Sequence, residues 1–184
     1  TENIKDCEVI VPGSKSYSHR LLIAAALSDG MCKIQNCLKS EDTLLTLDAL
    51  KQLGVKIDMK NNELVVHGTG GRLGSTDSPV YLANSGTSMR LLTGVVTLGE
   101  GMYTLTGSER MFERPIQDLL DGLNQLGIYA KSINSNGCPP VEVRGGTIKG
   151  GSVSLKCKVS SQYLSSLLLM APYTSEGLDI KVVE

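Results

Sequence analysis

The sequence predicts an α/β (α+β) fold in which repeated β-α-β-α-β-β units pack around buried, parallel helices. The first observation behind this prediction is an internal repeat, with about 70 to 75 residues between matching positions. The second is that each copy contains a helical segment with apolar side chains nearly all the way round. Helices without a polar face belong in the interior of a protein.

The matching segments run through the whole chain. Arg20 of the first copy corresponds to Arg90 of the second, and a third, incomplete copy starts at Ser160. The aligned segments of the first two copies are residues 16–36 with 86–107 and residues 48–57 with 121–130. We therefore expect residues 15–184 to form one domain of repeated units, the third of them incomplete.

Each copy follows the same order of elements. The buried helices are expected at residues 21–27, 89–98 and 164–171, and the strands that follow them at residues 32–35, 103–106 and 178–183. In the first two copies, apolar side chains at helical spacing then predict an amphipathic helix, which Gly54 and Gly127 end at matching positions. Strand pairs at residues 55–59 with 63–67 and 127–133 with 141–143 complete these units.

The composition and net charge exclude several classes of protein. The chain has 18 basic and 19 acidic side chains and a net charge of -1, so no overall field attracts nucleic acid or an anionic membrane. The longest apolar run, Leu21 to Leu27, is far shorter than the roughly 20 residues of a membrane span. The N-terminus lacks a signal-peptide pattern. We therefore expect a cytoplasmic protein that binds neither nucleic acid nor membrane.

The cysteines give no sign of a disulfide framework or a zinc site. Their positions are Cys7, Cys32, Cys37, Cys138 and Cys157. They are odd in number and never spaced as CxxC, so we expect free thiols and no metal.

Polar and cationic residues gather where each buried helix begins. These are Lys15, Ser16 and Arg20 in the first copy, Asn84, Gly86, Thr87 and Arg90 in the second, and Ser160, Ser161 and Gln162 in the third. A helix N-terminus presents free N–H groups and a partial positive charge, so added cations are favourable where an anion binds. Each start taken singly is also compatible with a solvated, capped turn. Together they predict an anion-binding floor at one end of the domain.

Further residues adjoin this predicted floor. Arg114 immediately precedes Pro115 at a helix start, where a fixed guanidinium can reach a carboxylate or phosphate with paired N–H donors. Arg110 is expected to be a surface charge and His19 a packed or surface histidine, while His67 carries no functional signal. The GSKS segment is not a nucleotide-binding P-loop, because a serine separates its glycine from its lysine.

Four segments occur in an order that resembles a known family. They are VPGSKSYSHR, LANSGTSMR, ERPIQDLLDGL and VSSQYLSSLLLMAP, and they look like successive motifs of 5-enolpyruvylshikimate-3-phosphate synthases. The resemblance covers nearly the entire chain and corresponds to the N-terminal part of that family. It implies an enolpyruvyl transferase-like domain of the shikimate pathway. The implied reaction transfers the enolpyruvyl group of phosphoenolpyruvate to the 5-hydroxyl of shikimate 3-phosphate, with no metal or organic cofactor.

The resemblance also implies roles for residues of the floor. Lys15 would be catalytic and would touch both substrates. Shikimate 3-phosphate would be bound by Lys15, Ser16, Arg20, Ser160, Ser161 and Gln162. Phosphoenolpyruvate would be bound by Lys15, Asn84, Gly86, Thr87, Arg90, Arg114 and Gln162.

The resemblance further implies a missing second domain, which in this family supplies the proton-transfer groups. Residues 1–14 would form a first strand and a hinge region toward that domain. The chain alone would then be a substrate-binding half without activity. Leu91 stands where many members of the family have proline, and this difference leaves the response to glyphosate, the family's inhibitor, open.

Other functions remain open at this point. The sister family of UDP-N-acetylglucosamine enolpyruvyl transferases shares the repeat, but it has a GAKN-like motif and a reactive cysteine. Here the motif is GSKS, and Ser108 to Arg114 contains no cysteine. A noncatalytic phosphate-binding module could keep the same repeat. RNA 3'-phosphate cyclases use related repeats, but the neutral charge and lack of exposed aromatic residues argue against them.

Overall fold

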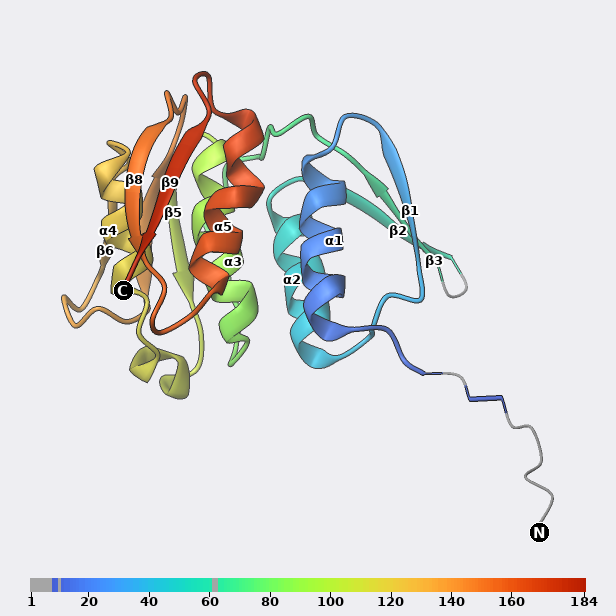
Figure 1. Cartoon of the computed structure of the whole chain (residues 1–184). Coiled ribbons are helices and arrows are strands. Elements are labelled where there is room, and N and C mark those ends of the chain that lie inside the picture. The colour runs from blue at the N-terminus through green and yellow to red at the C-terminus, as the bar shows by residue number, and fades with distance from the viewer. Residues whose placement is uncertain (1–7, 10, 61–62) are drawn as a thin grey trace, which may run out of the picture.

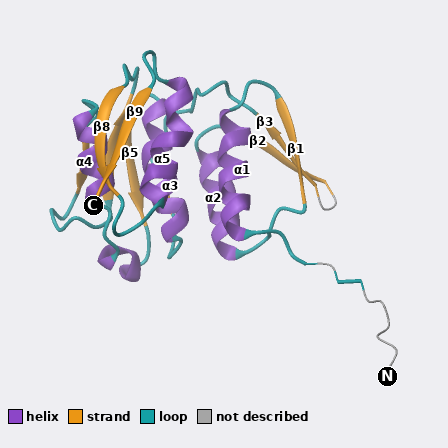
Figure 2. Ribbon diagram, in the orientation of Figure 1, coloured by secondary structure: helices purple, strands orange, loops and turns teal. Residues whose placement is uncertain are grey.

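The protein consists of a layer of helices flanked by sheets. The computed structural model describes residues 8–9, 11–60 and 63–184 of the chain. Its central helices are α1 (Lys15–Leu27), α3 (Gly86–Val95) and α5 (Gln162–Met170), which begin at the lower end of the molecule in Figure 1. Sheets lie on both outer sides of this layer (Figure 2). The parallel central helices predicted from the sequence are therefore confirmed.

The first unit joins α1 to a three-stranded sheet. Its further elements are β1 (Met31–Gln35), α2 (Glu41–Gln52), β2 (Lys56–Lys60) and β3 (Glu63–His67). Strand β3 lies in the middle and pairs antiparallel with β1 and β2. Leu64 and Val66 of β3 are buried while their neighbours are only partly covered, which is the alternation of a sheet with one face on the core.

The second unit has the complete predicted order. It contains β4 (Val80–Tyr81), α3, β5 (Gly101–Thr106), α4 (Gln117–Gln125), β6 (Ala130–Ser132) and β7 (Val141–Gly145), with 3₁₀ turns at Val96–Leu98 and Glu109–Glu113. The strands form a sheet in the order β4-β5-β7-β6, in which β4 runs parallel to β5. The β-α-β-α-β-β unit inferred from the repeat is thus present.

The third unit contains β8 (Gly151–Lys156), α5, a 3₁₀ turn at Ala171–Tyr173 and β9 (Leu178–Val183). Strands β8 and β9 are parallel, like β4 and β5 in the second unit. The first strand of a unit therefore pairs with the strand that follows its central helix.

Equivalent glutamines connect one unit to the next. Gln52, at the end of α2, donates from Nε2 to the carbonyl oxygen of Ser78, 2.9 Å away, just before β4. Gln125, at the end of α4, donates from Nε2 to the carbonyl oxygen of Ser154 in β8, at 3.1 Å. Gln52 and Gln125 occupy matching positions of the repeat. The second helix of each unit thus holds the first strand of the following unit.

Capping residues position the helix starts. Ser14 caps α1 by accepting from the backbone N–H of Tyr17, and Ser85 caps α3 in the same way through Ser88. Ser40 forms a capping box with Thr43 at the start of α2. At the other ends of α2 and α4, Gly54 and Gly127 have φ values of +87° and +77°, which suit glycine. These local signals confirm where α2 begins and where α2 and α4 end. The central helices begin earlier than expected, at Lys15, Gly86 and Gln162 in place of residues 21, 89 and 164.

Some expected elements differ from the structure. Residues 8–9 and 11–14 contain no strand, so the strand predicted before α1 is wrong for those residues, and the rest of it lies outside the described part. The repeat unit predicts an opening strand, but no position was predicted for the opening strands β4 and β8. Strand β4 has only two residues, too few to show a period, and β8 has only Val153 and Leu155 as apolar residues among serines, glycine and lysine.

The central helices are not equally buried. Nearly every residue of α3 is buried, as predicted. In contrast, α1 exposes half of Leu21 and α5 exposes 54% of Leu168, so these two helices each have an uncovered side among the described residues. The prediction of complete burial is therefore wrong for α1 and α5, because apolar character alone does not guarantee a covering neighbour.

Several expected absences concern only the described residues. Within them, no helix is both long and apolar enough to cross a membrane, and no group of three or more His, Cys, Asp or Glu residues could hold a metal ion. Cys32, Cys37, Cys138 and Cys157 are free thiols, whereas Cys7 lies outside the described residues.

Candidate anion-binding site

The starts of α1 and α3 line a polar cavity of about 300 Å³. Its lining residues are Lys15, Glu41, Asp42, Asn84, Gly86, Thr87, Arg90 and Arg114. Cationic side chains from separate parts of the sequence therefore meet at the N-terminal end of the helical layer. The partial positive charge of the helix starts adds to theirs, so the cavity is suited to an anion.

Arg114 can reach the cavity because residue 86 is a glycine and has no side chain in its path. A Cβ atom at Gly86 would lie 2.6 Å from Nη1 of Arg114, closer than such atoms approach in proteins. Gly86 therefore leaves room for the guanidinium beside the start of α3. Arg114 itself has an extended backbone just before Pro115, the conformation that a following proline favours. Arg110 is exposed, as predicted.

Gln162 connects the start of α5 to the start of α3. Its Nε2 donates to Oγ1 of Thr87 at 3.0 Å, and its Oε1 accepts from Nη1 of Arg90 at 3.1 Å. The guanidinium of Arg90 also lies 5.8 Å from the centre of the Tyr163 ring, within the range of a cation–π contact. The orientation of Arg90 over the cavity is thus set by residues of α5.

A second group of predicted residues lies beside the cavity and does not line it. Arg20 donates from Nη2 to Oγ of Ser165 at 2.9 Å and from Nη1 to the carbonyl oxygen of Ser16 at 3.0 Å. Ser160 accepts from the backbone N–H of Gln162 at 3.2 Å, and Ser161 is the N-cap residue of α5. These contacts bring the starts of α1 and α5 together, so Ser16, Arg20, Ser160 and Ser161 border a neighbouring part of the same end.

The comparison with known proteins now decides the family. The family model described as EPSP synthase (3-phosphoshikimate 1-carboxyvinyltransferase) matches residues 3–184. The chain belongs to the EPSP synthase family. This confirms the resemblance, and it favours the shikimate family over the sister transferases and over a noncatalytic module.

Relatives of the EPSP synthase family match almost the entire chain. The 3-phosphoshikimate 1-carboxyvinyltransferase of Methanothermobacter thermautotrophicus is 47% identical over 95% of this chain and 41% of its own length. The chloroplastic enzyme of Arabidopsis thaliana is 45% identical over 95% of this chain and 35% of its own length. The chain therefore spans about two-fifths of the length of the curated relatives it matches.

Solved structures agree with the fold. An EPSP synthase from Acinetobacter baumannii has a TM-score of 0.82 and 35% identity, covering 90% of this chain and 38% of that one. The enolpyruvyl transferase NikO from Streptomyces tendae has a TM-score of 0.63 at 17% identity, covering 94% of this chain and 39% of that one, and shows the fold alone. The enolpyruvyl transferase-like fold is thus confirmed.

Acidic residues of this EPSP synthase domain also enter the cavity, which the sequence did not predict. Glu41 and Asp42 come from the first turn of α2, and Oδ2 of Asp42 contacts Nζ of Lys15. Acidic side chains in a first turn are favourable beside the helix dipole, so in the sequence they indicated only a helix start. The repeat could not have identified them, since Glu41 and Asp42 align with Arg114 and Pro115 of the second unit.

A buried chain of hydrogen bonds lies beneath the cavity. Nδ1 of His19 is 2.7 Å from Oγ1 of Thr46, which is 2.7 Å from Oγ of Ser88, and Ser88 is 2.6 Å from Oγ of Ser85. This chain joins α1 and α2 to the cap of α3. His19 is fully buried, and burial, aided by Lys15 and Arg20, lowers its pKa from 6.5 to about 4. His19 is therefore a packed, neutral histidine, as predicted.

Two buried polar atoms close to the floor have no hydrogen-bond partner among the described residues. They are Nε2 of His19 and Oδ1 of Asn84. Asn84 lines the cavity, so its free oxygen is an acceptor that a hydroxyl or N–H group could use.

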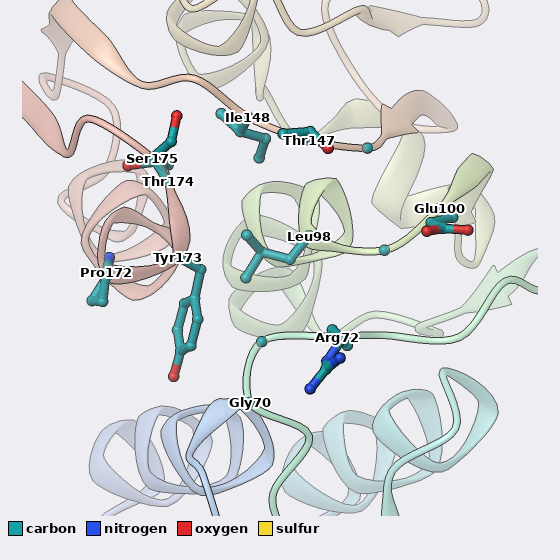
Figure 3. Close-up of a pocket in the computed structure, with 13 residues that line it drawn as sticks. Gly70, Arg72, Leu98, Glu100, Thr147, Ile148, Pro172, Tyr173, Thr174 and Ser175 are labelled. Atoms are coloured by element: carbon teal, nitrogen blue, oxygen red, sulfur yellow. The ribbon is translucent and has the colours of Figure 1, made fainter.

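A larger cavity lies at the opposite end of the helical layer (Figure 3). Its volume is about 490 Å³, and it is lined by residues 70–72, 98–100, 146–148 and 172–175. Arg72 is its only cation and is accompanied by Glu100, and both are exposed. Tyr173 extends toward α1, where its hydroxyl donates to the carbonyl oxygen of Leu27 at 2.6 Å. This end carries the negative ends of the helix dipoles, so it does not suit an anion.

Proposed function

We propose that this chain is the substrate-binding half of an enzyme that transfers the enolpyruvyl group of phosphoenolpyruvate to shikimate 3-phosphate. The products would be 5-enolpyruvylshikimate 3-phosphate and phosphate. The observation that carries the proposal is the cavity in which Lys15, Arg90 and Arg114 meet at parallel helix starts. The names of the relatives support the reaction, and their greater length means that the activity belongs to a longer protein.

Phosphoenolpyruvate is the ligand that we assign to the cavity itself. It carries a phosphate and a carboxylate on a small carbon frame, and paired guanidinium donors bind both groups well. Arg90 and Arg114 provide such donors, and Lys15 adds an ammonium. Asn84, Gly86, Thr87 and Gln162 would complete this site.

Shikimate 3-phosphate is assigned to the adjoining part of the floor. Ser16, Arg20, Ser160, Ser161 and Gln162 surround the junction of α1 and α5. In support, Arg20 donates to Oγ of Ser165 in α5 and to the carbonyl oxygen of Ser16, which keeps its guanidinium at this junction. Lys15 stands between the two groups and would contact both substrates.

The chemistry requires proton movement and charge stabilisation. The 5-hydroxyl gives up its proton and its oxygen adds to the enol carbon of phosphoenolpyruvate, while the methylene carbon gains a proton and becomes a methyl group. One methyl proton is then lost as the bond to phosphate breaks, which restores the double bond. Lys15, as the catalytic cation, would stabilise the charge that develops on the phosphate. His19 is unsuited to carry these protons, because it is fully buried and its pKa lies near 4. We assign proton transfer to a second domain, with the segment before α1 as the hinge toward it.

The remaining parts of the proposal concern the setting of the reaction. The site needs no metal or organic cofactor, and we expect the enzyme to act in the cytoplasm without nucleic acid or membrane. The response to glyphosate stays open because of Leu91, which is fully buried in α3, one residue after Arg90.

Titration of the 184-residue chain with shikimate 3-phosphate, followed by amide NMR, tests the proposed function. We expect saturable shifts at residues 15–20 and 160–162 with millimolar affinity, since no second domain excludes water from the ligand. Inorganic sulfate serves as the control for simple charge binding. The proposal would be contradicted if shikimate 3-phosphate bound no more tightly than sulfate, or if its shifts appeared only at the opposite end of the helices.

A further inference from the structure

Lys15 has a carboxylate partner inside the cavity that we propose to bind anions. Its Nζ contacts Oδ2 of Asp42, and the two side chains are 48% and 27% exposed. A ligand that enters the cavity can therefore reach both groups. Arg90 differs, because it donates to the neutral amide oxygen of Gln162. An incoming anion finds Arg90 beside a neutral partner but finds Lys15 beside a negative charge.

The backbone holds Asp42 in a fixed place. Asp42 lies in the first turn of α2, between Ser40 and Thr43, which form the capping box. Its carbonyl oxygen accepts a hydrogen bond from Oγ of Ser88 at 3.2 Å, which fastens the start of α2 to α3. Lys15 instead has a long, flexible and half-exposed side chain. When the two separate, we expect the ammonium to move and the carboxylate to stay.

An ordinary role for Asp42 has to be distinguished from a functional one. A carboxylate in the first turn of α2 stabilises the helix through its dipole, whatever stands next to it. Lys15, on the other hand, stands at the positive end of α1, and Asp42 offsets that unfavourable position. A helix-stabilising role predicts an effect on folding alone, whereas a role toward Lys15 predicts an effect on ligand affinity.

We propose that Asp42 is an internal counter-anion, which holds Lys15 in the ligand-free protein and gives it up to the phosphate of the ligand. Asp42 then lowers the affinity of the cavity for anions, because an anion can pair with the Lys15 ammonium only after the ion pair with Asp42 has separated. Its presence weakens phosphate binding and keeps Lys15 from pairing with other anions. This inference rests on the proposed function only in that the cavity binds a phosphate group.

A double-mutant cycle with inorganic phosphate tests the inference on the 184-residue chain. Asp42→Asn removes the charge at nearly constant size and should lower the dissociation constant for phosphate about three- to tenfold. In a Lys15→Ala background, the same substitution should change the dissociation constant less than about twofold, since no ammonium remains to be released. Simple repulsion between Asp42 and the ligand would instead persist in both backgrounds.

Asp48→Asn is the matched control. It removes the same charge from an exposed position of the same helix that does not line the cavity, and it should leave phosphate affinity unchanged. Thermal melts without ligand give an independent measurement: Asp42→Asn should lower the melting temperature more in the presence of Lys15 than in the Lys15→Ala background.

The outcomes are distinct from those of the proposed function. The inference is overturned if Asp42→Asn binds phosphate no more tightly than the wild type, or not at all, or if the tightening is equal in both backgrounds. Weaker binding by Asp42→Asn would mean that the carboxylate orients Lys15 for the ligand. If the expected phosphate cycle appears but shikimate 3-phosphate binds no better than sulfate, the counter-anion stands and the proposed function fails.

Discussion

The two ends of the helical layer differ in the cations that meet there. The cavity at the helix starts has about 300 Å³ and contains Lys15, Arg90 and Arg114 beside two acidic residues, whereas the cavity at the helix ends has about 490 Å³ and contains Arg72 beside one acidic residue. Both ends belong to the same parallel helices, so their dipoles have opposite effects. The comparison teaches that the smaller cavity is the better candidate site, because converging charge matters more than volume.

The largest expected effect is a complete loss of activity: the 184-residue chain alone should show no turnover. We assign the proton-transfer groups to a second domain, so the 184-residue chain alone should not catalyse both addition and elimination. A coupled assay of phosphate release with both substrates measures this. Measurable turnover by the purified chain would show that one of the two ends already contains the proton-transfer machinery.

The second expected effect is a loss of stability at acid pH that originates beneath the floor. His19 has a folded pKa of about 4 against 6.5 when unfolded, so the unfolded chain binds the additional proton first. Stability is fully present above pH 6.5 and falls as the pH drops from 6.5 toward 4, by up to about 3 kcal/mol. Urea unfolding between pH 4.5 and 7 should show this loss for the wild type.

The matched variant for this prediction is His19→Asn. Asparagine cannot be protonated but can still bond to Thr46, so the unfolding free energy should vary less with pH across the same interval. A wild type and variant with equal pH dependence would mean that His19 is not the group responsible and that the buried network does not set acid stability at this end.

The third effect concerns Lys15, for which we expect a large change in binding and a small change in folding. Losing a charge-assisted contact costs roughly 1.5 to 3 kcal/mol, so Lys15→Ala should weaken shikimate 3-phosphate or phosphoenolpyruvate binding about ten- to a hundredfold. The exposed contact with Asp42 should contribute less than about 1 kcal/mol to stability. Calorimetric titration and thermal melts on the same sample measure both. A clear drop in melting temperature with intact affinity would count against the site.

The smallest expected effect is at the opposite end and sharpens the comparison. Arg72→Ala removes the only cation that lines the larger cavity, and it should leave phosphate binding unchanged within error. Titration beside Lys15→Ala measures it under the same conditions. If Arg72→Ala weakened phosphate binding as strongly as Lys15→Ala, the proposal that phosphate binds only at the helix starts would be wrong.

Much of this arrangement could be predicted from the sequence where local signals agree. The matching of Arg20 with Arg90, and of Gly54 with Gly127, gave the repeat and the helix limits, because glycine at positive φ ends a helix whatever surrounds it. Most of the predicted phosphoenolpyruvate residues line one cavity, namely Lys15, Asn84, Gly86, Thr87, Arg90 and Arg114, whereas Gln162 does not line it but contacts Thr87 and Arg90. Their roles toward a ligand stay predictions.

The rest depended on tertiary contacts without a sequence period. Strand β4 has two residues, too few for a sequence period, and its partner β5 comes about twenty residues later in the chain, after α3. Asp42 looked like an ordinary first-turn acid until the structure placed it against Lys15. The exposed sides of α1 and α5 could not be predicted either, because the apolar residues of a helix indicate which side chains can be buried but not which neighbouring element covers them.

The glutamine bonds between units have a consequence for how the chain unfolds. Gln52 and Gln125 each belong to one unit but bond to the backbone at the start of the next unit, so consecutive units are joined by side-chain hydrogen bonds. We therefore expect local opening of the second helix in one unit to loosen the start of the next unit, which couples the stability of neighbouring units.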